Sequence, residues 1–109
     1  MAYDEGLAER IRAHLAARAD VSERKMLGGI AFMVGGNMAV GVTGDELMVR
    51  LDPADGDKAL AEDGVRTMDM TGRPMKGWIL VSPDRTADEA GLSEWVEAGA
   101  DYAASLPAK

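Results

Sequence analysis

The sequence contains no cysteine, a single histidine and only 5% aromatic residues. The absence of cysteine excludes disulfides, thiolate metal sites and cysteine nucleophiles. His14 has no companion cysteine or histidine for an ordinary zinc site, and no serine nucleophile motif accompanies it. We therefore expect His14 to be a structural or surface residue, and we expect no catalytic residue, no bound metal and no cofactor.

The sequence also lacks any apolar run near the roughly 20 residues that a membrane-spanning helix needs. Its start, residues 1–5, has neither the basic nor the apolar region of a signal peptide, so we expect a cytoplasmic protein. Basic residues are in the minority: the sequence has 12 Lys and Arg residues and 19 Asp and Glu residues, which gives a net charge of −7. This charge disfavours direct binding to nucleic acid or to membranes, and it favours contact with a basic protein.

What the sequence does contain is the composition of one globular domain. A length of 109 residues with 47% hydrophobic residues is ordinary for a domain with a single core, so we expect one domain over residues 1–109. Apolar spacing predicts helices over about 4–18, 52–62 and 86–105, the last with a capping box formed by Thr86 and Glu89. Short alternating runs predict strands over 24–27, 30–34, 38–42, 46–51, 66–70 and 77–82.

This order, α-β4-α-β2-α, predicts an α+β fold with an antiparallel sheet of about six strands and flanking helices. The first and last helices can cover one face of the sheet, whereas the short middle helix covers little. The opposite face is moderately apolar, with side chains such as Met33 and Met48. We therefore expect that a second protomer or another partner covers part of this face.

Two other patterns resemble binding motifs but have simpler explanations. Asp52, Asp55 and Asp57 lack the alternation of an EF-hand loop, and acidic residues are common where a helix begins. The glycine pairs at 28–29 and 35–36 do not have the spacing of phosphate-binding loops, and hairpin turns explain them.

The segment Thr71–Trp78, with the sequence TGRPMKGW, crowds two cations and a tryptophan around a turn. A turn followed by a strand explains its glycines and proline, and its cations would then only be solvated. The alternative is a contact site, because tryptophan and arginine are common hot-spot residues in interfaces. The candidate partner-binding residues are Arg73, Met75, Lys76 and Trp78, with Lys25 and Arg50 adjoining.

The segments Lys25–Gly29, Phe32, Gly36–Met38 and Gly72–Trp78 together resemble the N-terminal domain of the TfoX/Sxy family. The similarity extends over about residues 3–106. It implies an α+β fold like that of secretion chaperones and YgaC-like proteins, and often a homodimer. Full-length members regulate natural competence in bacteria with the cyclic-AMP receptor protein, and the helical C-terminal domain of those members has no counterpart in this sequence. The family offers no established catalytic residues.

Three functional hypotheses follow from these observations. The first is a non-enzymatic interaction domain associated with transcription or competence regulation, which contacts a protein partner such as a transcription factor. The second is a small-molecule-binding domain or minor enzyme, with a pocket between helix and sheet that converges on Arg73, Arg50 and His14. The third is weak DNA binding through a local basic patch, which would depend steeply on salt.

Overall fold

A computed structural model describes residues 3–26, 28–69 and 74–108 of the chain. The fold is α+β, with four helices and six strands in the described residues. In chain order the elements are α1 (Glu5–Leu15), β1 (Val21–Met26), β2 (Gly29–Val34), β3 (Asn37–Thr43), β4 (Glu46–Arg50), α2 (Pro53–Ala59), β5 (Val65–Asp69), β6 (Pro74–Val81), α3 (Pro83–Thr86) and α4 (Glu89–Ser105).

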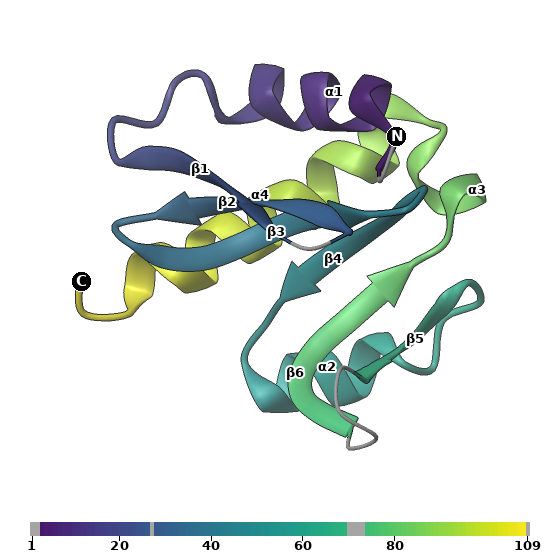
Figure 1. Cartoon of the computed structure of the whole chain (residues 1–109). Coiled ribbons are helices and arrows are strands. Elements are labelled where there is room, and N and C mark those ends of the chain that lie inside the picture. Colours follow the sequence, from purple (N-terminus) through teal and green to yellow (C-terminus); the bar gives the residue numbers. More distant parts are fainter. Residues whose placement is uncertain (1–2, 27, 70–73, 109) are drawn as a thin grey trace.

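All six strands form one open antiparallel sheet in the order β1-β2-β3-β4-β6-β5. The first four strands are neighbours both in sequence and in space, as short connections require. The chain then leaves the sheet through α2, forms the edge strand β5 and returns beside β4 as β6 (Figure 1). This return places β6 in the interior of the sheet, with Trp78 opposite Arg50 at the end of β4.

The main core lies between one face of the sheet and the helices α1 and α4. Ile11 on α1, Phe32 on β2, Val49 on β4 and Leu92 on α4 are all fully buried there. The helix α2 lies on the same face and packs along β6, where Gly56 of the helix lies directly against Gly77 of the strand. The helix α2 therefore covers the part of this face formed by β6. The sequence had indicated that this short helix covers little of the sheet.

The opposite face carries a second apolar cluster whose members all come from strands. Met48, Met68 and Leu80 are buried, and Met38 and Trp78 pack partly exposed against them. The sheet is strongly twisted, so that β6 crosses the direction of β2 and β3 (Figure 1). These side chains already shield one another, and coverage of this face by a second protomer or another partner stays a prediction.

The start of α1 agrees with the prediction, but the start of the last helix does not. Asp4 caps α1 by accepting a hydrogen bond of 3.1 Å from the amide of Leu7. Thr86 is not the cap of the last helix, because Pro83 begins a separate short helix that ends at Thr86. The Thr86 hydroxyl donates to the Pro83 carbonyl, and Asp88 caps α4 by accepting from the amide of Gly91 at 3.1 Å.

The turn between β2 and β3 also differs in detail from its prediction. Gly35 and Gly36 have positive φ, but Asn37 already belongs to β3 and its side chain is buried. The Asn37 amide donates to the Pro107 carbonyl at 2.9 Å and thereby ties the start of β3 to the chain just beyond α4. None of the helices that the structure describes has the length and apolar character needed to cross a membrane.

Candidate functional site

Arg50 and Trp78 face each other where β4 and β6 pair. They are register partners at the end of β4, and the Arg50 guanidinium carbon lies 5.3 Å from the centroid of the Trp78 ring. On α4, the ring of Tyr102 lies 5.7 Å from the same carbon. All three side chains are partly exposed. A cation held between two aromatic rings is attracted by both, which orients Arg50 without a salt bridge.

The charge of Arg50 is not matched by a nearby acid. In the described part of the chain, no carboxylate oxygen lies within 4.0 Å of its guanidinium nitrogens. Five other arginines do have such a partner, namely Arg10, Arg12, Arg18, Arg66 and Arg85. Arg50 is therefore a half-buried cation whose hydrogen-bond donors remain available to an incoming acceptor.

The remaining candidate residues lie in different places. Lys76 is exposed two positions before Trp78 on β6, and it lines a small pocket together with Trp78 and with Asp57 and Leu60 at the end of α2. Lys25 is exposed on the edge strand β1, and β2, β3 and β4 separate it from β6. Arg73 and the side chain of Met75 lie outside the described residues. The structure thus places Arg50 beside Trp78, and it does not bring Lys25 there.

The second glycine of the Thr71–Trp78 segment has a structural reason. Gly77 has a φ of 82°, and its carbonyl accepts a hydrogen bond of 2.7 Å from the amide of Leu51. A Cβ atom at this position would lie 2.4 Å from the Leu51 carbonyl oxygen. Only glycine allows β6 to approach the end of β4 this closely, and the approach positions Trp78 beside Arg50.

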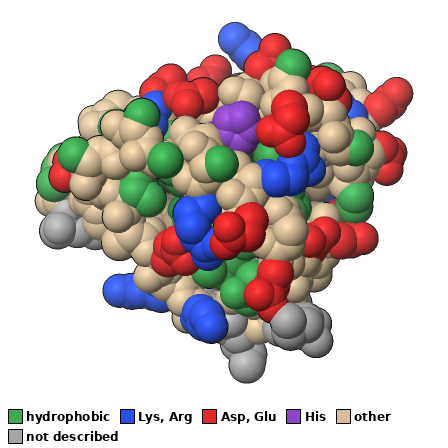
Figure 2. Space-filling view, turned by 90° about the horizontal axis from the view of Figure 1, so that it is seen from above, with side chains coloured by type: hydrophobic (Ala, Val, Ile, Leu, Met, Phe, Trp, Pro, Cys, Tyr) green, Lys and Arg blue, Asp and Glu red, His purple; other side chains and the backbone are tan. Residues whose placement is uncertain are grey.

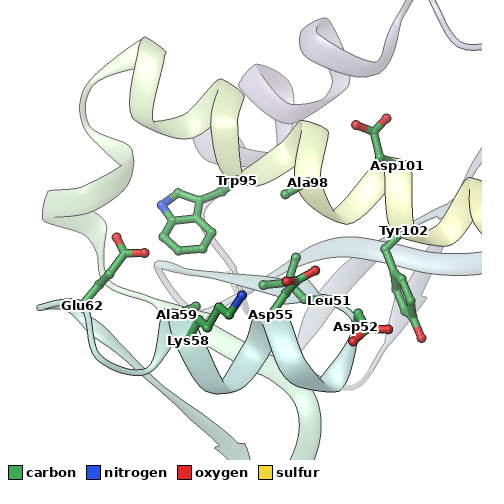
Figure 3. Close-up of a pocket in the computed structure, with 10 residues that line it drawn as sticks. All are labelled: Leu51, Asp52, Asp55, Lys58, Ala59, Glu62, Trp95, Ala98, Asp101 and Tyr102. Carbon is green, nitrogen blue, oxygen red and sulfur yellow. The ribbon is translucent and has the colours of Figure 1, made fainter.

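A groove of about 480 Å³ lies between α2 and α4 (Figure 3). Trp95 and Tyr102 of α4 form one wall together with Ala98, and Leu51 and Ala59 belong to the opposite side. The groove also has four carboxylates and one amine around it, those of Asp52, Asp55, Glu62, Asp101 and Lys58. The sequence-based prediction did not include this groove, although Trp95 also packs partly buried against the main core. The spacing of Trp95, Ala98 and Tyr102 on one helix face was the available signal.

His14 belongs to an ion-pair network far from Arg50. Its Nε2 lies 2.9 Å from a carboxylate oxygen of Glu89, and Arg10 binds the other oxygen of that carboxylate. The hydrogen bond from Arg10, followed by that from His14, lowers the pKa of Glu89 from its ordinary value. Figure 2 shows the histidine at the surface on this side of the molecule, among acidic and basic side chains.

The second hypothesis predicted a pocket that converges on Arg50, Arg73 and His14. Arg50 and His14, the two of these that the structure describes, do not lie together. Arg50 lies with Trp78 and Tyr102, whereas His14 lies with Glu89 at the start of α4. Among the described residues, no three His, Asp or Glu side chains are grouped closely enough to hold a metal ion.

Comparison with known proteins gives one result. A family model described as the TfoX N-terminal domain matches residues 13–103, which is nearly the whole chain. Searches of curated proteins and of solved structures found no match. The matched range includes the Arg50–Trp78 pair and the α2–α4 groove, and the match confirms the resemblance inferred from Gly72–Trp78 and the earlier segments.

Proposed function

Because this chain belongs to the TfoX N-terminal domain family, we propose that it is a non-enzymatic interaction domain in transcription regulation, acting through contact with a partner protein. The TfoX N-terminal domain is not a known enzyme family, and its full-length members are associated with competence regulation. The proposed contact surface consists of Arg50, Trp78 and Lys76, together with Arg73 and Met75 of the same segment.

The observation that carries this proposal is the stacking of Arg50 on Trp78. Arginine and tryptophan are enriched among the few residues that dominate binding energies in interfaces. The ring orients the guanidinium in advance, so that less side-chain entropy is lost when a partner binds. A carboxylate of the partner can then form paired hydrogen bonds with a cation that has no carboxylate within 4.0 Å in the described part of the chain.

The charges on this face favour an acidic partner rather than the basic one expected from the net charge. Strand alternation and register place Arg24, Arg50, Arg66 and Glu46 on the face that carries Trp78. Glu46 is paired with Arg66. This face therefore carries an excess of cations, even though the chain as a whole has a net charge of −7. Local charge, not net charge, determines which partner surface is attracted at close range.

The proposal is tested with a double variant that removes charge without touching the core. Arg50→Ala with Lys76→Ala removes the two described cations of the surface, and Lys25→Ala is the control because it removes an exposed cation on the distant strand β1. The partner is first recovered by affinity capture from the cells of origin, identified by mass spectrometry and purified. Affinities of the three proteins for it are then measured by calorimetry.

We expect the double variant to weaken binding about thirtyfold or more, because truncation of a hot-spot residue costs about 2 kcal/mol or more. Lys25→Ala should bind and melt like the unmodified protein, and the double variant should stay folded with a melting temperature lowered by the loss of the stacking of Arg50 on Trp78 and Tyr102. Equal affinities for all three proteins would show that the Arg50–Trp78 surface is not the contact site.

A further inference from the structure

The strand β5 forms a free edge of the sheet, because among the described residues it pairs with β6 alone (Figure 1). The amide of Ser82 donates to the Gly64 carbonyl at 2.8 Å, which fixes the phase of the hydrogen bonds between the two strands. In an antiparallel pair only every second residue bonds to the facing strand. Arg66 therefore bonds to β6, whereas the C=O of Val65 and the N–H of Thr67 point outward to the free edge.

A small pocket lies beside Thr67, on the face of the sheet that α2 covers. Thr67 is the register partner of Ile79, a residue of the main core on that face. Leu60 and Asp57 at the end of α2 line the pocket together with Thr67, and Lys76 of β6 also borders it. The pocket has a volume of about 190 Å³, which is below the roughly 300–1,000 Å³ of small-molecule sites and suits a single side chain.

Leu60 gives this pocket an exposed apolar wall. It is 37% exposed, and in the described part of the chain it is the one large hydrophobic residue that is classed as exposed. An apolar side chain that enters the pocket would remove part of this surface from water, which is favourable. The pocket therefore offers a place for one apolar side chain directly beside the free edge of β5.

The residue before Thr67 points to the opposite face of the sheet, where cations are in excess. The side chain of Arg66 is 60% exposed on that face, and Glu46 is its ion-pair partner. Arg50 lies two strands away on the same face, and in the described part of the chain no carboxylate lies within 4.0 Å of it. Successive side chains of an extended segment along β5 would therefore meet the apolar pocket and the cationic face in turn.

The other edge of the sheet is less suited to pairing. On β1 the residues Ser22–Lys25 are all exposed and polar or charged, which is typical of an edge that does not accept a further strand. The carboxylate of Glu23 is also held by Arg12 of α1 at 2.8 Å. These features favour β5 over β1 as the edge that pairs with another chain.

We propose that an extended acidic segment of the partner protein adds to β5 as a further strand of the sheet. An apolar side chain of the segment occupies the pocket beside Thr67, and acidic side chains on either side of it face Arg66. Main-chain hydrogen bonds give such a complex its affinity, and the pocket gives it specificity. This inference rests on the proposed function, because it specifies which part of the partner binds, and Lys76 joins the pocket to the proposed contact surface.

The first test uses peptides selected from a phage-displayed library of random linear sequences, together with amide hydrogen exchange followed by NMR. In the free protein the amide of Thr67 should exchange quickly and that of Arg66 slowly, since only the latter bonds to β6. A bound peptide should slow exchange at Thr67 and leave Arg66 unchanged. The selected peptides should share an apolar residue between acidic ones. Peptides without acidic residues, or a Thr67 amide that still exchanges quickly in the complex, would overturn the proposal.

The second test compares variants of the edge and of the pocket by calorimetry with a selected peptide. Thr67→Pro removes the outward N–H at an edge position where proline is tolerated, and Thr67→Ala is its control because it keeps that N–H. Leu60→Ser removes the apolar wall, and Ala61→Ser is its control at an exposed neighbouring position outside the pocket. Thr67→Pro and Leu60→Ser should each weaken binding about tenfold or more, and the controls should bind nearly like the unmodified protein.

Equal binding by Leu60→Ser and Ala61→Ser would overturn the proposal even if Thr67→Pro fails to fold. The natural partner then separates this proposal from the proposed function. If Arg50→Ala with Lys76→Ala weakens the partner but the partner does not protect the Thr67 amide, the contact surface stands and strand addition is wrong. If the partner protects Thr67 but ignores the double variant, strand addition stands without that surface. A dimer in light scattering whose Thr67 amide is already protected would assign the edge to a second copy and overturn the proposal.

Discussion

Substitution of Gly77 by alanine tests whether the Thr71–Trp78 segment is constrained by packing as well as by turn geometry. Gly77 has a φ of 82°, and an added Cβ atom would lie 2.4 Å from the Leu51 carbonyl oxygen. A second backbone contact limits any relief, because Gly56 of α2 packs directly against Gly77. The strand cannot move away without breaking the hydrogen bond between the Leu51 amide and the Gly77 carbonyl.

Two contributions add up in the expected loss of stability. Left-handed backbone at a non-glycine residue costs roughly 1–2 kcal/mol. An extra carbon in a close-packed contact costs roughly a further 1–3 kcal/mol. Gly77→Ala should therefore lower the free energy of unfolding by roughly 2–5 kcal/mol, which is a large part of the usual stability of a small domain.

The control is Gly28→Ala, because Gly28 has nearly the same φ, 80°, but a Cβ atom added there would meet no atom within 4 Å among the described residues beyond its chain neighbours. This variant carries the backbone penalty alone, roughly 1–2 kcal/mol. Urea unfolding of the two variants measures the difference, and the midpoint of Gly77→Ala should fall by about 1 M or more at an unchanged slope. If both variants lose the same stability, the close approach of β6 to Leu51 does not constrain this position.

Two further predictions concern a helix cap and an acid-sensitive ion pair. Asp88→Ala should destabilise the fold by about 1 kcal/mol because the amide of Gly91 loses its acceptor, while Asp88→Asn should be nearly neutral in the same thermal melts; an equal loss in both would contradict the cap. The hydrogen bond from Arg12 lowers the pKa of Glu23 below its ordinary value of 4.5. Because the folded-state pKa is the lower one, this stabilisation is present above the unfolded pKa and is lost as pH falls through the folded pKa. Glu23→Gln should therefore lose less stability than the unmodified protein between about pH 5 and about pH 3, and parallel losses in urea titrations would refute this.

Much of the fold could be predicted because its elements have strong local signals. Leu7, Ile11 and Leu15 recur with the helical period on α1, and all three are buried. The predicted strands agree with the observed ones to within about three residues at either end. The strand starts shift most at β1 and at β6, by three residues each. At β1 polar residues hide the alternation, since this edge strand reads VSERKM.

The misplaced cap shows where local signals are ambiguous. Thr86 and Glu89 have the spacing of a capping box, but Pro83 also favours the first position of a helix. The chain forms both a short helix and a long one, and the Glu89 carboxylate binds Arg10 and His14 of α1 instead of its own backbone. The contact between Arg10 and Glu89, which are 79 residues apart in the sequence, outweighed the local capping pattern. The spacing of residues within one segment does not predict such a contact.

The sequence by itself determined the type and order of the six strands and the three longer helices, the antiparallel sheet and the family, because these depend on periodicity, turn residues and a specific motif. Only the tertiary structure decided that Arg50 stacks on Trp78, that Lys25 lies three strands away from this pair, and that Trp95 and Tyr102 face α2 across a groove. Periodicity identifies which face of an element is apolar. It does not identify what packs opposite that face, because strand order and helix placement follow from contacts between residues far apart in the chain.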